Sequence, residues 1–173
     1  MNESTIKALQ QILFPNNPEE WDGQWGPKSQ RALDAVIHPA FGPEHHVKAS
    51  SFADPADVRA FRRCKEQGKT EQECFRVGDN GVGCWNDNVS EGTGASCALP
   101  PDDMIEKWGS IANAKHKLVE VSANGKTVTC VLRDRMPWKK NIHNGAGIDL
   151  NPDAVRALGL EPPIMVPAVW KWI

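Results

Sequence analysis

The chain has 173 residues, with 20 basic and 22 acidic side chains and a formal net charge of −2. Because phosphate binding needs clustered Lys and Arg, this balance excludes nucleic acid as the main partner. No apolar stretch approaches the length that spans a membrane, and the first residues lack the basic start and apolar core of a signal peptide. If the protein acts outside the cytoplasm, phage-style release, a dedicated secretion apparatus or a leader absent from this sequence would deliver it.

Two short helices are predicted at the start of the chain. Apolar residues at helical spacing predict the first over residues 4–13, and Pro15-Asn-Asn-Pro18 ends it. A turn at Asp22-Gly-Gln-Trp25-Gly26 precedes the second helix, which has Pro27 at its first position. These elements predict a helical module over residues 1–40.

A linker and a helical hairpin are predicted next. Residues 41–53 hold Gly, Pro, two adjacent His and two Ser, which is typical of a linker. A helix is predicted to begin at the N-cap Asp54 and to end at Gly68. Thr70-x-x-Glu73 is a capping box that opens another short helix. The hairpin is therefore expected over residues 54–76.

Five cysteines occur in the chain, and no two of them form a CxxC pair, so no metal site is predicted. Four lie close together in sequence, which favours local disulfides. We expect Cys64–Cys74 to pin the helical hairpin, Cys84–Cys97 to form a second bridge, and Cys130 to be a buried thiol. The alternative is that all five are reduced core residues.

From Val77 onward the pattern changes to β-structure. Two alternating segments around Asn124-Gly125 predict a β-hairpin, since this pair accepts the positive φ angles of a type I′ turn. Asn151-Pro152 predicts a short helix that ends at Gly159. Residues 164–172 predict the final strand, and residues 77–173 together form the expected barrel domain.

The N-terminal segment carries Ile6-x-x-Leu9-Gln10, followed by Asp22-Gly23-x-Trp25-Gly26. This pattern resembles the peptidoglycan-binding module of many wall hydrolases. Ser29 stands where that family usually has Thr, which keeps the hydroxyl. The resemblance implies that residues 1–40 bind peptidoglycan, with Trp25 as a candidate contact. A generic helical hairpin is the alternative.

The C-terminal half carries three motifs in order: Asn124-Gly125-Lys126, Val131-x-Arg133-Asp134-Arg135-x-Pro137, and Gly147-Ile148-Asp149-Leu150-Asn151-Pro152. They resemble the double-psi β-barrel of rare lipoprotein A, expansins and some lytic transglycosylases, although Met136 replaces the usual Gly. The resemblance implies an α+β protein, with a six-stranded double-psi β-barrel and short helices after the helical module. Residues 81–85 would form its first strand, and residues 97–108 would cross over to the hairpin.

Asp149 is the main catalytic candidate. Glycoside cleavage needs an acid, and a lytic transglycosylase can work with one acid/base residue whose pKa is raised. The alternative is that Asp149 only hydrogen-bonds the turn into the next helix. Asp87 resembles in placement the base of family 45 cellulases and is the second candidate, unless it is an ordinary loop residue. Asp134, beside two arginines, is expected in a structural ion pair.

Three further side chains are candidate sugar contacts. Trp85 and Trp138 offer indole faces for stacking, and His143 lies in the loop before Asp149. Core packing is the alternative for every Trp except Trp138.

The sequence therefore predicts a peptidoglycan-directed cell-wall protein that cleaves glycan strands as a lytic enzyme. We expect a monomer without a cofactor, located in the periplasm, the cell wall or outside the cell. The alternatives are a non-catalytic, expansin-like wall-binding protein and a structural component of a phage tail or secretion machine.

Overall fold

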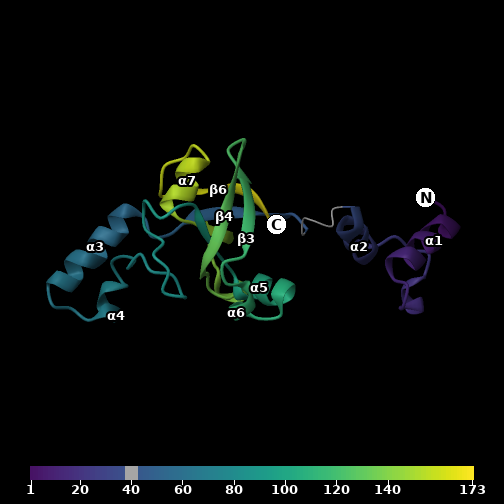
Figure 1. Ribbon diagram of the computed structural model, residues 1–173, viewed down its shortest axis with the longest axis horizontal. Coiled ribbons are helices and arrows are strands. Elements are labelled where there is room, and N and C mark those ends of the chain that lie inside the picture. Colours follow the sequence, from purple (N-terminus) through teal and green to yellow (C-terminus); the bar gives the residue numbers. More distant parts are fainter. Residues whose placement is uncertain (38–42) are drawn as a thin grey trace. The chain divides into compact units, whose positions relative to one another are not determined.

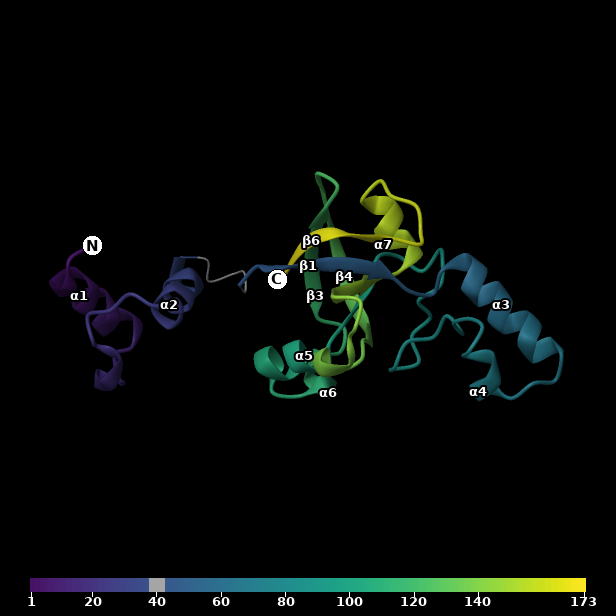
Figure 2. The same ribbon diagram turned by 180° about the vertical axis from the view of Figure 1, so that it is seen from behind.

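The structure is a computed structural model that describes residues 1–37 and 43–173. The chain forms two compact units, Met1–Pro43 and Glu44–Ile173. Residues 38–42, which hold the predicted end of the helical module and the start of the predicted linker, lie outside the described residues. Figures 1 and 2 show the elements of both units from opposite sides.

The first unit contains the two predicted helices, α1 (Glu3–Leu13) and α2 (Pro27–Ile37), with a short 3-10 turn at Pro18–Glu20 between them. The buried side chain of Gln10 joins helix and turn. Its amide nitrogen donates to Asp22 Oδ1 (2.8 Å), and its oxygen accepts from the Gly23 backbone N–H (2.9 Å). These two bonds connect the Leu9-Gln10 and Asp22-Gly23 elements of the sequence.

The second unit is a closed, mixed β-barrel of six strands. The strands are β1 (His45–Ser51), β2 (Ser96–Leu99), β3 (Leu118–Ala123), β4 (Lys126–Arg135), β5 (Ala146–Leu150) and β6 (Met165–Trp172). Their order around the barrel is β1-β5-β2-β4-β3-β6. The pairs β1–β5 and β2–β4 are parallel, and the other four pairs are antiparallel. The protein is therefore α+β, with a six-stranded barrel as predicted.

Short helices connect the strands: α3 (Pro55–Glu66), α4 (Glu71–Cys74), α5 (Pro101–Trp108), α6 (Ile111–Ala114) and α7 (Pro152–Ala157), with a 3-10 turn at Lys139–Asn141. Figures 1 and 2 both show α3 and α4 projecting away from the strands. The predicted capping box at the start of α4 is confirmed, because the Thr70 and Glu73 side chains each accept from the other's backbone N–H. Among the described residues, no helix has the length and hydropathy needed to cross a membrane.

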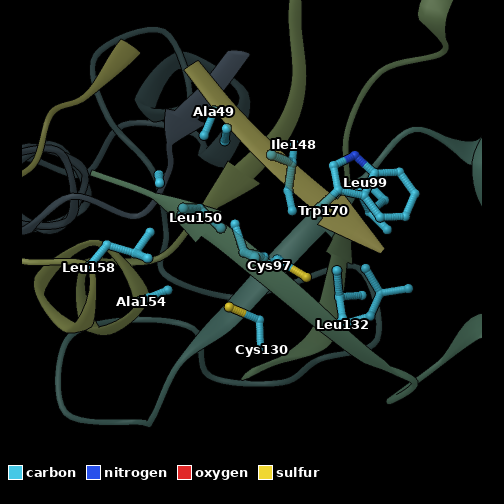
Figure 3. Packing of buried hydrophobic residues seen from close by; sticks show 14 of the residues in the cluster. Ala49, Cys97, Leu99, Cys130, Leu132, Ile148, Leu150, Ala154, Leu158 and Trp170 are labelled. Carbon is cyan, nitrogen blue, oxygen red and sulfur yellow. The ribbon is translucent and has the colours of Figure 1, made fainter. Parts of the chain in front are cut away.

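The barrel core is filled by alternate residues of the strands. Ala49, Cys97, Ile148 and Leu150 are fully buried there, and Trp170 packs over the same cluster (Figure 3). Because neighbours along a strand point to opposite faces, residues 50, 98 and 149 face outward. The choice of which residues in each strand face the core therefore also determines which side chains reach the outer surface.

Three segments have a structure that differs from the one predicted from the sequence. Residues 45–51 of the predicted linker form β1, and the ring of His45 stacks on Trp170 with 3.9 Å between centroids. Residues 81–85, the predicted first strand, form a loop with only an isolated bridge between Val82 and Asn88. Residues 97–108 also do more than cross over, since β2 lies within the barrel. β1 was missed because its partners, β5 and β6, are about a hundred residues away in sequence, and local pattern does not report such pairing.

One disulfide prediction is confirmed and one is wrong. Cys64 and Cys74 are bonded and join α3 to α4; closing so short a loop stabilises it by about 2–3 kcal/mol. Cys84 and Cys97 are free thiols, because Cys84 is exposed in a loop while Cys97 is buried in β2. The sulfur of Cys97 instead faces that of Cys130, the predicted buried thiol (Figure 3).

Candidate functional site

A row of paired residues crosses four adjacent strands on the outer face of the barrel. Ser50 of β1 pairs with Asp149 of β5, Asp149 pairs with Ala98 of β2, and Ala98 pairs with Asp134 of β4. Residues that pair directly across strands share a face of the sheet. The row therefore places two carboxylates on one surface, with only the small side chain of Ala98 between them.

Irregular pairing on two strands brings this row into register. The β1–β5 register shifts between Lys48 and Ala49, and the β2–β4 register shifts between Cys97 and Ala98. The residues left unpaired are Gly147 and Arg133. A Cβ atom at Gly147 would lie 2.4 Å from the Val47 side chain, so glycine is needed there for packing. Bulges of this kind re-aim the following side chain, which here is Asp134 after Arg133.

Asp149 has the electrostatic character that an acid/base residue needs. Burial raises the pKa of its carboxyl to about 6; the Ser50 hydroxyl, which donates to Asp149 Oδ1, opposes this shift, and the nearby Asp134 and Asp54 add to it. Its side chain is only partly exposed. Because the negative form is disfavoured by desolvation, this carboxyl is protonated over a wider pH range than a surface aspartate.

Asp134 is fixed by backbone hydrogen bonds rather than by the predicted ion pair. Its Oδ1 accepts from the backbone N–H groups of Cys84 (2.8 Å) and Arg135 (2.7 Å). In the described part of the chain neither adjacent arginine forms an ion pair with it, and the Arg133 guanidinium donates to the carbonyl of Thr93 (2.8 Å). Burial raises the pKa of Asp134, which these hydrogen bonds oppose.

A third carboxylate, Asp54, lies beside the row and was assigned only a capping role from the sequence. Its Oδ2 accepts from the Ser51 hydroxyl (2.9 Å), and it makes no side-chain cap to α3. Asp54 is 7% exposed, and its Oδ1 has no hydrogen-bond partner among the described residues. Burial therefore raises the pKa of Asp54 as well. The sequence feature that could have indicated this role for Asp54 is the nearby Ser50-Ser51 pair, which was assigned to the predicted linker.

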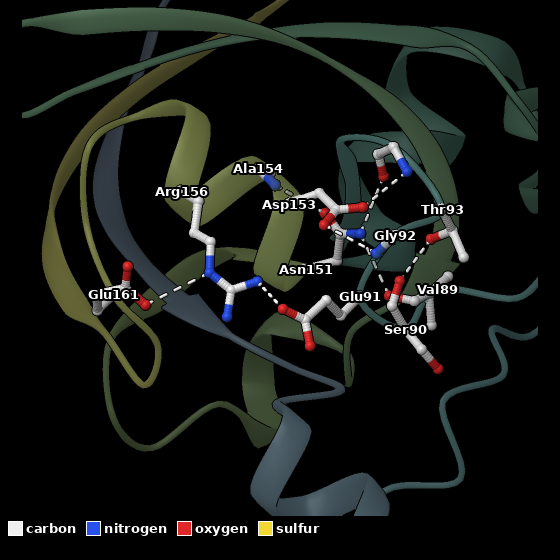
Figure 4. Close-up of polar contacts among 11 residues, drawn as sticks. Val89, Ser90, Glu91, Gly92, Thr93, Asn151, Asp153, Ala154, Arg156 and Glu161 are labelled. Carbon is white, nitrogen blue, oxygen red and sulfur yellow. Dashed lines mark hydrogen bonds and ion pairs between the residues drawn. The ribbon is translucent and has the colours of Figure 1, made fainter.

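The segment that follows Asp149 is held rigidly by a polar network (Figure 4). The fully buried Asn151 side chain accepts from the backbone N–H groups of Ser96 and Ala154 and donates to the carbonyls of Val89 and Gly94. Asp153 accepts from the backbone N–H groups of Gly92 (3.0 Å) and Gly94 (2.7 Å). This network joins α7 to the loop before β2 and fixes the position of the strand that carries Asp149.

The loop between β4 and β5 carries two predicted sugar contacts, Trp138 and His143, and belongs to the same unit as Asp149. Trp138 is 40% exposed and His143 is exposed. Met136, at the start of this loop, is buried against Ala98 and Ala146. At the start of the 3-10 turn, the Lys139 backbone N–H donates to Asp102 (3.0 Å), and the Lys139 ammonium pairs with the buried Asp103. The loop is thus pinned to α5.

The remaining predicted residues lie in other environments. Asp87 is paired with His116, with 2.8 Å between Oδ2 and Nε2, so it is not in the row of Asp149. Trp85 is partly buried and packs against the barrel core, which fits the alternative of core packing. Trp25, in the first unit, is partly exposed, and its indole N–H donates to Gln30 (2.9 Å).

Comparisons with known proteins found distant structural likenesses. No protein-family profile and no curated protein sequence matches the chain. Streptomyces papain inhibitor is similar at 19% identity and a TM-score of 0.44, over 78% of this chain and 97% of the inhibitor. The apo expansin of Clavibacter michiganensis is similar at 15% identity and a TM-score of 0.45, over 76% of this chain. A substituted form of that expansin in complex with cellohexaose gives 14% identity, a TM-score of 0.43 and 76% coverage. The match spans 50% of the expansin chain in both cases.

Proposed function

We propose that this protein is a peptidoglycan-directed cell-wall protein whose barrel cleaves glycan strands as a lytic transglycosylase, with Asp149 as the acid/base. The observation that carries the proposal is the partly buried Asp149 carboxyl, whose pKa is raised to about 6 on the outer face of the barrel. An acid with such a pKa can donate a proton to a glycosidic oxygen near neutral pH and then accept one as a base.

Neighbouring groups support this role. The Ser50 hydroxyl orients the carboxyl, and Asp134 lies two strands away in the same row. With a strand spacing of about 4.8 Å, the two backbones are roughly 10 Å apart. Inverting hydrolases hold their two carboxyls about 6.5–9.5 Å apart. If Asp134 were to activate water, hydrolysis would replace the internal attack of a muramyl hydroxyl, and the two reactions give different products.

We further infer a division of labour between the two units. The helical unit would hold peptidoglycan, and the barrel, which we assign to the double-psi type on its two parallel strand pairs, would act on it. Trp138 and His143 would contact the sugar beside Asp149. The Cys64–Cys74 bridge is consistent with an oxidising location such as the periplasm or the cell wall.

The test incubates purified sacculi with the wild type, Asp149→Asn and the matched control Asp57→Asn, an exposed carboxylate of α3. We expect soluble anhydro-muramyl products from the wild type and the control only. Loss of about a hundredfold or more in the Asp149→Asn variant fits the contribution of a general acid. Reducing-end products without the anhydro ring would assign hydrolysis, and equal release by all three proteins would remove Asp149 from the reaction.

A second function, glycan binding without turnover, is favoured by one observation. Asp134 Oδ1 already accepts two backbone N–H groups, which is the pattern of a structural carboxylate. In that case Asp149 would contact sugar alone, as in an expansin-like wall-binding protein. Retention of the wild type on sacculi with no soluble product, and weaker retention of Trp138→Ala, would establish this second function in place of the first.

A further inference from the structure

The helical hairpin α3–α4 presents an arginine face that the proposed reaction does not use. Arg59, Arg62 and Arg63 are all exposed. At 3.6 residues per turn they lie on one side of α3. Cys64 and Phe61 lie on the other side, where Cys64 is bonded to Cys74 and Phe61 packs on Phe75 with 5.0 Å between ring centroids. The arginine face is therefore turned away from α4.

The side chains of the three arginines have no partner in the part of the chain that the structure describes. None of them forms an ion pair or side-chain hydrogen bond with another residue of the ranges 1–37 and 43–173. Glu66, which follows Arg62 and Arg63 by about one turn, is exposed and forms no ion pair with them. The chain as a whole carries a net charge of −2, so this cationic face differs from the rest of the molecule. Three forked guanidinium groups on one helix face are suited to carboxylates or phosphates on a partner.

The hairpin begins at the edge of the Asp149 site. The Phe52 backbone N–H donates to the Leu150 carbonyl (3.1 Å), and α3 starts three residues later. With a rise of 1.5 Å per residue, Arg59 and Arg63 lie roughly 6 and 12 Å along the helix from its first residue. A polymer that lies across Asp149 and continues along α3 would therefore meet these arginines.

The charge of a polymer determines whether it gains affinity from this arrangement. Burial raises the pKa of Asp149, and the nearby carboxylates Asp134 and Asp54 raise it further, so negative charge is disfavoured at this site and an anionic strand would be repelled there. A neutral glycan gains nothing from three arginines nearby. A strand that carries carboxylates can form ion pairs with the arginines of α3 while its sugar lies at Asp149. These ion pairs offset the repulsion by the aspartates.

We propose that the arginine face of α3 binds carboxylates carried by the glycan strand, so that the site selects an anionic wall polysaccharide over a neutral one. This inference rests on the proposed function, since it assumes that the same strand lies at Asp149. It assigns to the hairpin, whose two helices are joined by the Cys64–Cys74 disulfide, a role in substrate selection.

The test measures binding rather than cleavage, with the full chain carrying Asp149→Asn to prevent turnover. The probes are soluble peptidoglycan strands with free carboxylates, the same strands after chemical amidation, and poly(glycerol phosphate). We expect the free-carboxylate strands to bind about tenfold more tightly than the amidated strands, since each exposed ion pair contributes up to about 1 kcal/mol. The preference should fall as salt is raised.

Two triple variants distinguish the effect of the arginine face from the effect of overall positive charge on the hairpin. Arg59→Gln, Arg62→Gln and Arg63→Gln together should abolish the preference while leaving binding of the amidated strands unchanged. The matched control removes three charges of the same hairpin outside that face, by Lys65→Gln, Lys69→Gln and Arg76→Gln, and should keep the preference.

The outcomes distinguish this inference from the proposed function. Equal binding of free and amidated strands, loss of the preference in the control variant, or tighter binding of poly(glycerol phosphate) would overturn the inference and leave glycan binding intact. Binding of no strand at all would overturn the proposed function, and the inference with it. Thermal unfolding and circular dichroism of both variants verify that the hairpin is folded.

Discussion

Two aspartates four residues apart illustrate opposite uses of a carboxylate. Asp153 accepts from two backbone N–H groups and holds a loop to α7. Asp149 accepts from one hydroxyl, is partly buried, and has its pKa raised to about 6. A carboxylate whose acceptor capacity is filled by the backbone is part of the scaffold. One that is desolvated with few donors is destabilising to the fold and is available to a ligand.

The largest expected effect is on the stability of the polar network around Asp153, and a substitution at Asn151 tests it. Asn151→Ala removes four hydrogen bonds and leaves two buried N–H groups and two carbonyls without their partner. At roughly 0.5–1.5 kcal/mol for each bond, we expect the free energy of unfolding to fall by about 3 kcal/mol or more. Denaturant titration measures it. Asn144→Ala, which removes one partly buried bond from the Ala146 backbone N–H, is the control and should cost about 1 kcal/mol. A loss at Asn151 no larger than the control would show that the network is not the scaffold.

The same substitution at the two aspartates should change stability in opposite directions. Asp153→Asn replaces one acceptor oxygen with an amide that faces a backbone N–H, so we expect a loss of about 1–2 kcal/mol at pH 7. Asp149→Asn removes a desolvated charge and keeps an oxygen for Ser50, so we expect a gain of about 1–2 kcal/mol at pH 7.

The pH dependence sharpens this prediction. Because the folded-state pKa of Asp149 is raised from 3.8 to about 6, the native protein binds a proton more readily than the unfolded chain between these values. The contribution of Asp149 to stability therefore falls as pH rises from about 4 to about 6. The gain from Asp149→Asn should be complete above pH 6 and absent below pH 4. A gain that persists at pH 4 would contradict the assigned cause.

The smallest expected effect concerns Ser50, whose hydroxyl favours the charged form of Asp149. Ser50→Ala should raise the pKa of Asp149 further and reduce stability at pH 7 by up to about 1 kcal/mol. Carboxyl-carbon NMR titration measures the pKa directly. Ser122→Ala, which removes a contact to Thr127 on the β3–β4 hairpin, is the control. A titration of Asp149 that is the same in both variants would mean that Ser50 does not set it.

Local features of the fold were predictable from the sequence because each is encoded within a few residues. The Thr70–Glu73 capping box, the Asn124-Gly125 turn and the Asn151 cap of α7 lie where the pattern placed them. The Cys64–Cys74 bridge follows from two helices joined by a short turn. In each case the interacting groups are separated by ten residues or fewer, so local geometry alone brings them together.

The amino-acid sequence by itself determined the helical hairpins and the β3–β4 turn, and it indicated Asp149 as a candidate. Only the tertiary structure decided that residues 45–51 are a barrel strand, that Asp134 and Asp54 accompany Asp149, and that Asp87 pairs with His116 instead. The physical reason is strand register. A single bulge, such as that at Arg133, changes which side chains share a face, and pairing between distant segments leaves no local pattern to read.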